Sequence, residues 1–252
     1  MTSVHPLPTP PGARGRPGRR GRRSAAVWDG RVQSWDTHVS EGPGFAAIRA
    51  AVLTAAAVTP SDRVVDLGAG TGFLTLPLAV ASRDVLAVDV SQRMLDRLAL
   101  AAAAVPTTAV RVLCADLAQV DLPPASVDVV VSCYALHHLA HEDKRMLLQR
   151  AAGWLRPGGR LVVADMMFGR GGTGRDRAIL AQQARVMLAK GPAGAWRLIR
   201  NVSRLGLGVG QDRPAPPAFW TAAAQAAGLV EVRYEPVVAE AGLLVASRAG
   251  SG

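Results

Sequence analysis

The stretch that decides the fold is Val64-Val65-Asp66-Leu67-Gly68-Ala69-Gly70-Thr71-Gly72-Phe73. A run of apolar residues is followed directly by a glycine-rich turn, and the turn opens into a predicted helix that runs through about Ala81. Glycine allows tight backbone angles and the close approach of a ligand, and the first N–H groups of a helix can bind an anion. The pattern is therefore typical of a ligand-binding turn at the carboxyl end of a buried strand.

Downstream of this turn, short apolar runs alternate with helical segments. Strands are predicted over 63–67, 85–89, 110–114, 127–132 and 160–165, and helices over 92–104 and 142–155. The link between two further predicted strands, 229–238 and 242–247, is so short that only an antiparallel hairpin fits. Repeated strand-then-helix units predict parallel strands with right-handed crossovers. We therefore expect a doubly wound α/β fold with a mostly parallel seven-stranded sheet, a C-terminal antiparallel hairpin and helices on both faces.

The net charge of +10 is concentrated in two segments. Residues 1–25 contain six arginines, no acidic residue and little to bury, so we expect a disordered Arg/Pro/Gly-rich tail. Residues 166–213 carry nine basic residues against Asp176 and Asp212, and we expect them to form a helical lid that binds the acceptor, within a single domain over 26–252. The rest of the chain is slightly acidic, which argues against a uniformly basic nucleic-acid surface.

The cysteine content and the apolar runs bear on the compartment. Cys114 and Cys133 lie in separate strand-like runs and form no CxxC pair, so neither a disulfide framework nor a structural zinc site is expected. Apolar runs stay shorter than the roughly 18 residues expected of a membrane span, and no apolar stretch follows the N-terminal arginines as in a signal peptide. We expect a cytoplasmic protein.

The spacing of the glycines separates this turn from a dinucleotide-binding turn. The dinucleotide pattern GxGxxG requires its last glycine at Phe73 or Thr75, so it fails in either register. The remaining pattern, DxGxGxG, resembles motif I of the class I S-adenosylmethionine-dependent methyltransferases. The resemblance covers residues 44–165 and, in topology, the final hairpin. It implies a methyltransferase that uses S-adenosyl-L-methionine.

The resemblance also implies which residues hold that cofactor. Asp89, after the second strand, would bind both ribose hydroxyls, because a carboxylate accepts two hydrogen bonds at once; it could instead cap the next helix. Asp116, after the third strand, would hold the adenine amino group or could be a simple turn residue. Met94 would touch adenine or pack in the core. The full expected set is Asp66, Gly68, Ala69, Gly70, Thr71, Gly72, Asp89, Val90, Met94, Asp116, Leu117 and Cys133.

Methyl transfer from a sulfonium mainly requires alignment of the nucleophile and exclusion of water. A general base is needed only for a poor nucleophile, and the candidates after the fourth strand are Tyr134, His137 and His138, with Asp165 after the fifth. The two histidines could equally be structural. Because no carboxylate cluster accompanies them in the sequence, no metal site is expected.

The acceptor is the least determined part of the prediction. We expect an apolar or aromatic small molecule, such as a secondary metabolite, a quinone precursor or a lipid. Trp28 and Trp35 could cap its pocket or fill the core. The alternatives are an RNA or protein methyltransferase, indicated by the basic segments, and a catalytically silent cofactor-binding protein. An amphipathic stretch over 175–207 could contact a membrane surface, and nucleic acid is a possible but less favoured partner.

Overall fold

The structure, a computed structural model, describes residues 19–33, 35, 43–104, 109–169, 171–189, 191–192, 196 and 212–250. Its strands are β1 (Arg63–Leu67), β2 (Asp84–Asp89), β3 (Ala109–Cys114), β4 (Val127–Cys133), β5 (Leu155–Met166), β6 (Leu229–Pro236) and β7 (Ala241–Arg248). Its helices are α1 (Arg19–Asp29), α3 (Pro43–Ala56), α4 (Thr75–Ala81), α5 (Gln92–Ala103), α6 (His141–Trp154), α7 (Gly174–Leu188) and α9 (Pro217–Ala226), with a 3-10 turn, η1 (Leu136–His138).

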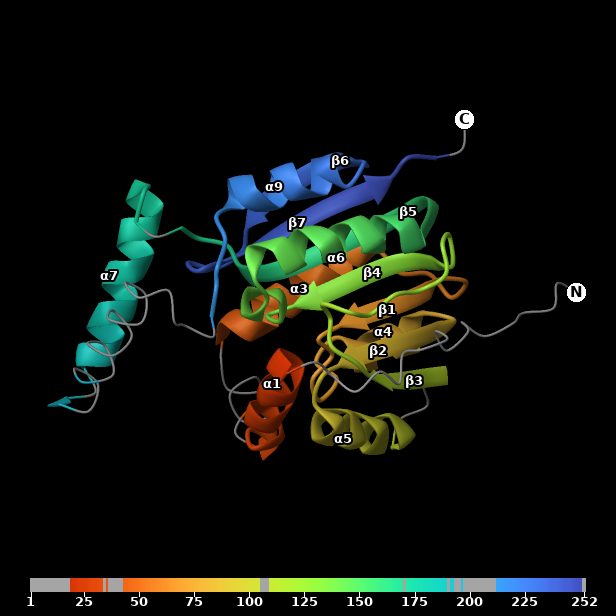
Figure 1. The fold of residues 1–252 in the computed structure, drawn as a ribbon, viewed down its shortest axis with the longest axis horizontal. Helices are drawn as coiled ribbons and strands as arrows, with labels where there is room; N and C mark the ends of the chain where they lie inside the picture. Colours follow the sequence, from red (N-terminus) through yellow and green to blue (C-terminus); the bar gives the residue numbers. More distant parts are fainter. Residues whose placement is uncertain are drawn as a thin grey trace, which may run out of the picture.

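The strands form one seven-stranded sheet in the order β3-β2-β1-β4-β5-β7-β6 (Figure 1). The pairs among β1 to β5 are parallel, whereas β7 runs antiparallel between β5 and β6. The predicted mostly parallel sheet with a C-terminal antiparallel hairpin is therefore confirmed.

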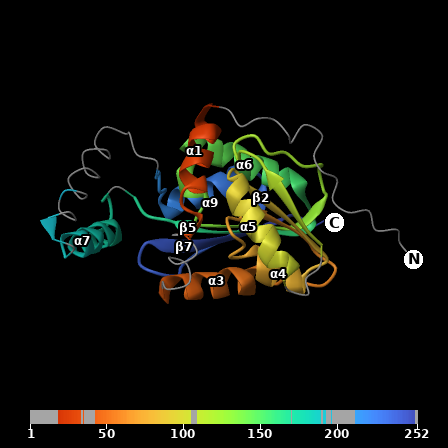
Figure 2. The same ribbon diagram turned by 90° about the horizontal axis from the view of Figure 1, so that it is seen from below.

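Helices cover both faces of the sheet, because successive strand residues point to opposite sides. Val64 packs with Ile48 of α3 and Leu78 of α4. Its neighbour Val65 belongs to the opposite layer, which includes Leu148 of α6 and other residues of α6 and α9. Figure 2 shows α3 and α4 on one side of the sheet and α6 and α9 on the other. This double covering explains why the strand sequences read as nearly continuous apolar runs.

The strand order places a switch point between β1 and β4. From β1 the chain proceeds through β2 and β3 on one side, and then returns to β4 on the other side. In open parallel sheets, the crevice outside the carboxyl ends at such a point is where ligands bind. The glycine turn after β1 lies at this crevice.

The expected disordered tail over residues 1–25 is wrong at its C-terminal end, because α1 begins at Arg19. Arginine has a high helix propensity, and the far end of the helix is fastened to the body of the domain. The carboxylate of Asp29 accepts a hydrogen bond of 2.6 Å from the Ser91 hydroxyl at the start of α5. Residues 1–18 lie outside the described residues.

The expected lid over residues 166–213 is also not seen in its described part. Figures 1 and 2 both show α7 projecting to the side of the sheet. Within α7, Ile179 is buried, but Val186 and Leu188 near the C-terminal end of the helix are more than half exposed. Most of 190–211, and with it most of the predicted membrane-contacting stretch, lies outside the described residues.

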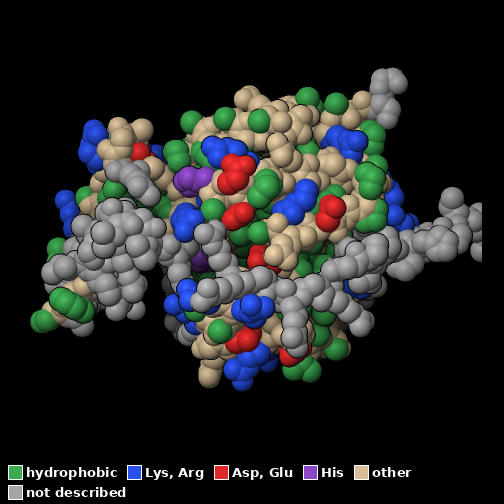
Figure 3. Space-filling view, viewed as in Figure 1, with side chains coloured by type: hydrophobic (Ala, Val, Ile, Leu, Met, Phe, Trp, Pro, Cys, Tyr) green, Lys and Arg blue, Asp and Glu red, His purple; other side chains and the backbone are tan. Residues whose placement is uncertain are grey.

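The described surface carries both signs of charge. In Figure 3, basic side chains lie on the projecting part and are interspersed with acidic ones over the body of the domain. None of the helices in the described part of the chain has the length and apolar character needed to cross a bilayer.

Candidate functional site

A cavity of about 650 Å³ lies at the carboxyl ends of β1, β2 and β4. Sites for small molecules and cofactors commonly occupy about 300–1,000 Å³. Its walls come from the glycine turn, from the loops after β2, β3 and β4, and from α1. The topology therefore brings together residues that the sequence separates widely.

The glycine turn approaches the β4 loop so closely that a side chain at Gly68 has no room. A Cβ built on Gly68 would lie 2.1 Å from the Cβ of Ala135, and the Gly68 φ of +78° is left-handed. Gly68, Ala69 and Gly70 line the cavity, as predicted. Thr71 and Gly72 do not. A Cβ on Gly72 would lie 2.5 Å from Leu98, so this glycine permits close packing against α5, and its role toward the cofactor stays a prediction.

Replacing Gly68 with alanine should therefore damage both the fold and the cavity. We expect a loss of about 2–4 kcal/mol in the free energy of unfolding, from strain and overpacking, and weaker binding of S-adenosylmethionine. Thermal unfolding and binding calorimetry measure the two effects. Gly153→Ala in α6 is the matched control, because a Cβ there meets nothing within 4 Å; it should stabilise the helix by about 0.5–1 kcal/mol. An unchanged melting temperature for Gly68→Ala would contradict the structure, because it would show that the turn can accommodate a Cβ at this position.

Asp89 joins the glycine turn to the start of α5. Its carboxylate accepts hydrogen bonds from the backbone N–H groups of Gly70 and Ser91, each at 2.9 Å. Ser91, and not Asp89, caps α5 by accepting from the N–H of Met94, so the helix-cap interpretation of Asp89 fails. Burial raises the pKa of Asp89. The side chain lines the cavity, where it can bind a ligand's hydroxyl groups.

The loops after β2 and β3 form a second wall. Val90, Met94, Asp116 and Leu117 all line the cavity, as predicted. The Asp116 carboxylate also accepts a hydrogen bond of 3.0 Å from the N–H of Ala118. Asp116 thus fills both of the roles considered for it, a turn residue and a cavity residue. Met94 and Leu117 give this wall an apolar surface.

Asp66 and Cys133 line the cavity from β1 and β4. Burial raises the pKa of Asp66 to about 7, although the Thr75 hydroxyl opposes the shift by donating a hydrogen bond of 2.6 Å to the carboxylate. Burial also raises the pKa of the Cys133 thiol, so the thiol stays protonated and is unsuited to act as a nucleophile.

The three predicted catalytic residues differ in whether they line the cavity. Tyr134 and His138 line the cavity, whereas His137 does not. Instead, His137 is buried against Asp165, with 2.6 Å between its Nδ1 and the Asp165 Oδ1, and its backbone N–H donates to the other carboxylate oxygen at 2.9 Å. Burial opposes the charge on both groups, but their attraction outweighs it, so the pKa of His137 is raised and that of Asp165 is lowered. His137 thus fastens the turn after β4 to the end of β5.

His138 has a partner that the sequence did not indicate. Its Nδ1 lies 3.1 Å from Oδ1 of Asp212. Asp212 is distant in sequence and lies near the C-terminal end of the predicted lid, residues 166–213. Burial lowers the pKa of His138. The backbone that carries Asp212 is held in place by the next residue, because the Arg213 N–H donates to the His137 carbonyl at 2.6 Å and the Arg213 carbonyl accepts from the buried Lys144 ammonium.

Helix α1 and the segment after it form the outer wall of the cavity, which was expected instead from residues 166–213. Trp28 and Trp35 both line the cavity, with ring centroids 5.5 Å apart. Trp28 also packs edge-on against the ring of His138 at 5.2 Å. Only Arg213 of the predicted lid, among its described residues, reaches the cavity. The Asp29–Ser91 contact that fastens α1 has no local sequence signal.

Part of the chain is similar in sequence to known methyltransferases. A family model described as "Methyltransferase domain" matches residues 64–159. An uncharacterized methyltransferase of Bacillus licheniformis is 38% identical over 106 residues, which are 42% of this chain and 48% of the relative. The chain thus matches about half the length of that curated relative.

Solved structures share the fold over most of the chain. A structure of the complex between the Trm112 methyltransferase activator and a methyltransferase of Haloferax volcanii aligns with a TM-score of 0.65 and 17% identity, covering 92% of this chain and 98% of the other. The cyclase SpnF aligns with a TM-score of 0.67 and 14% identity, over 92% and 97%. At these identities the likeness shows the fold alone. Residues 64–159, which contain the glycine turn, are thus similar to a methyltransferase domain, and the chain shares the fold of these solved structures.

Proposed function

We propose that this protein transfers the methyl group of S-adenosylmethionine to an apolar or aromatic small molecule. The observation that carries the proposal is the composition of the cavity wall. The whole chain has only 5 Trp, 4 Phe and 2 Tyr, yet five of these aromatic residues line this one cavity. They are Trp28, Trp35, Phe45, Phe73 and Tyr134.

These rings form a connected group and do not stand apart. Phe45 lies at its centre, with ring centroids 5.1 Å from Tyr134, 5.9 Å from Phe73 and 6.0 Å from Trp35. Such a wall excludes water, which methyl transfer requires, and it suits a flat or apolar acceptor.

The residues beneath the aromatic wall fit the cofactor. Asp89 would accept hydrogen bonds from the ribose hydroxyls, Asp116 would accept from the adenine amino group, and Met94 and Leu117 would enclose the adenine ring. Gly68 and Gly70 line the cavity, and backbone without side chains there would let the methionine portion approach closely. When bound, the cofactor supplies a methyl group that its positive sulfur already makes reactive.

Tyr134 and His138 would orient the acceptor at the methyl end. Burial raises the pKa of the Tyr134 phenol well above its usual value, so the phenol stays protonated and can form hydrogen bonds without acting as a base. His137, held by Asp165, would fix the turn that carries His138.

Transfer of a labelled methyl group tests the proposal directly. Purified protein is incubated with methyl-labelled S-adenosylmethionine and host-cell lysate, and the products are fractionated into organic extract, nucleic acid and protein. We expect label in the organic extract, and none with the Asp89→Ala variant. Label in nucleic acid or protein would contradict the small-molecule acceptor, and tight cofactor binding without transfer to any fraction would indicate a cofactor-binding protein without methyltransferase activity.

A further inference from the structure

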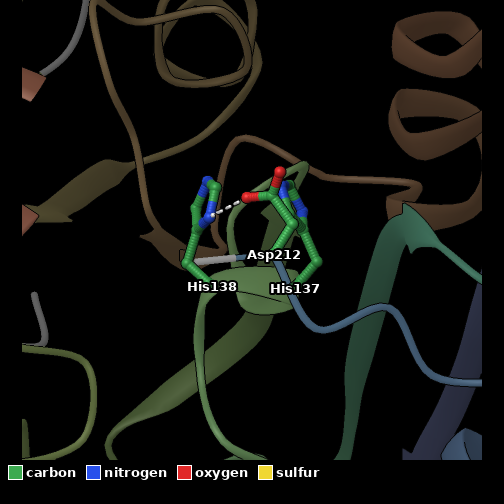
Figure 4. Close-up of side chains that lie close together, drawn as sticks. All are labelled: His137, His138 and Asp212. Carbon is green, nitrogen blue, oxygen red and sulfur yellow. Dashed lines mark ion pairs between the residues drawn. The ribbon is translucent and has the colours of Figure 1, made fainter. Parts of the chain in front are cut away.

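A cluster of two histidines and an aspartate lies at the edge of the cavity. His137, His138 and Asp212 each offer one ligand atom, and these three atoms lie within 4.8 Å of one another. Figure 4 shows the Asp212 carboxylate between the two imidazole rings, with all three side chains extending in the same direction. The ring centroids of the two histidines are only 3.9 Å apart. The sequence shows the adjacent histidines but not the carboxylate, which the fold brings in from a distant segment.

The surroundings of His137 are those of a metal ligand. Its Nδ1 is taken by Asp165 at 2.6 Å, which leaves Nε2 of the same ring for an ion. Histidines that bind metals usually direct their second ring nitrogen to a carboxylate, which fixes the orientation of the ring and makes it a better ligand. Asp165 is fully buried and is itself held by the backbone N–H groups of His137 and Met166.

The charge and the position of the cluster also suit a divalent ion. Asp165 and Asp212 supply two carboxylates, and the nearby Lys144 ammonium is directed to the backbone carbonyl of Arg213. His138 lines the cavity, so an ion bound to its ring would border the space for the acceptor. Its Nε2 is buried without a hydrogen-bond partner among the described residues, which shows that protein contacts alone leave this ring incompletely satisfied.

We propose that His137, His138 and Asp212 bind one divalent transition-metal ion, with Asp165 as the carboxylate that orients His137. Two imidazoles and one carboxylate suit zinc, iron(II) or cobalt(II) better than magnesium or calcium, which prefer oxygen ligands. Three protein ligands leave coordination positions open. The inference rests on the proposed function in one respect: the open positions would bind an acceptor through a lone pair on oxygen or nitrogen.

Cobalt(II) is the probe, because it substitutes for zinc and its visible absorption reports the ligand set. Full-length protein without a polyhistidine tag is treated with a chelator, desalted and titrated with cobalt(II). We expect saturable binding of one ion per chain. Asp212→Asn should weaken binding at least about tenfold, and His138→Gln should do the same. Asp212 is suited to this test because its side chain is 63% exposed, so its replacement should leave the fold intact, which the melting temperature checks.

His141→Gln is the matched control, since this neighbouring histidine lies outside the cluster; it should bind cobalt(II) as the wild type does. The proposal is overturned if the wild type shows no saturable binding, or if Asp212→Asn and His138→Gln bind cobalt(II) as tightly as it does. Binding of S-adenosylhomocysteine and methyl transfer, measured before and after chelation, separate the two proposals. Methyl transfer without metal binding would refute only the metal site, whereas metal binding without methyl transfer would refute only the proposed function.

Discussion

Replacing Asp89 with alanine should weaken the binding of S-adenosylmethionine at least about 100-fold. A hydrogen bond to a charged group contributes about 1.5–3 kcal/mol, and this carboxylate would make two of them with the ribose. The same carboxylate holds the glycine turn through Gly70, so its loss also loosens the wall that would face the methionine portion. Quenching of the fluorescence of Trp28 and Trp35, which line the cavity, measures the affinity.

Two further variants separate the loss of charge from general damage. Asp89→Asn keeps the size of the side chain and should weaken binding less than Asp89→Ala. Asp96→Asn changes an exposed carboxylate of α5 that accepts a hydrogen bond from the side chain of Gln92, and it should bind as the wild type does. If Asp89→Ala keeps its affinity while remaining folded, the ribose is held elsewhere and the assignment of the site is wrong.

Binding of S-adenosylmethionine should weaken about tenfold between pH 8 and pH 6. The pKa of Asp66 is raised to about 7, so its carboxylate is charged at pH 8 and mostly protonated at pH 6, and only the charged form attracts the cationic cofactor. One proton linked to binding changes the affinity by up to a factor of about ten for each pH unit below the pKa. The Asp66→Asn variant should bind weakly at both pH values. A flat profile for the wild type would show that Asp66 is not linked to binding.

The same variant should be more stable than the wild type without cofactor. The folded protein holds the Asp66 proton up to pH of about 7, whereas an unfolded chain releases it near pH 4. Stability therefore falls as the pH rises between these values and stays low above them. The shift corresponds to an upper limit of about 4 kcal/mol at pH 8. Chemical denaturation of the wild type and Asp66→Asn at pH 8 tests this, and a lower stability of the variant would contradict it.

The fold and the cofactor wall could be predicted because their signals are local in sequence. The β1 strand, its glycine turn and α4 are consecutive, and the spacing of Gly68, Gly70 and Gly72 alone excluded the dinucleotide pattern. Asp89 is the last residue of its strand and Asp116 lies two residues after its own, so predicting the strands also placed these side chains at one edge of the sheet. A motif does not show which glycine faces a ligand and which, like Gly72, packs beside a side chain such as Leu98.

The sequence indicates Trp28 and Trp35 as possible caps of the pocket, but the attachment of the outer wall could not be predicted because it depends on contacts between distant segments. Arginines 19 to 23 read as part of a solvated tail, and only the hydrogen bond from Ser91 to Asp29 shows that α1 is attached to the domain. Likewise, Asp212 lies in a basic, proline-containing segment with no regular pattern. Its approach to His138 depends on the packing of Lys144 and Arg213, which no spacing in the sequence encodes.

The central claim is that the cavity between the glycine turn, Asp89 and the aromatic wall binds S-adenosylmethionine. Calorimetric titration of the purified protein with S-adenosylhomocysteine tests it most directly, with NAD as the comparison ligand. The account predicts one saturable site per chain for S-adenosylhomocysteine and no measurable binding of NAD, since the third glycine of the dinucleotide pattern is replaced by Phe73. Absence of saturable S-adenosylhomocysteine binding by the folded protein, or equal binding of NAD, would contradict it.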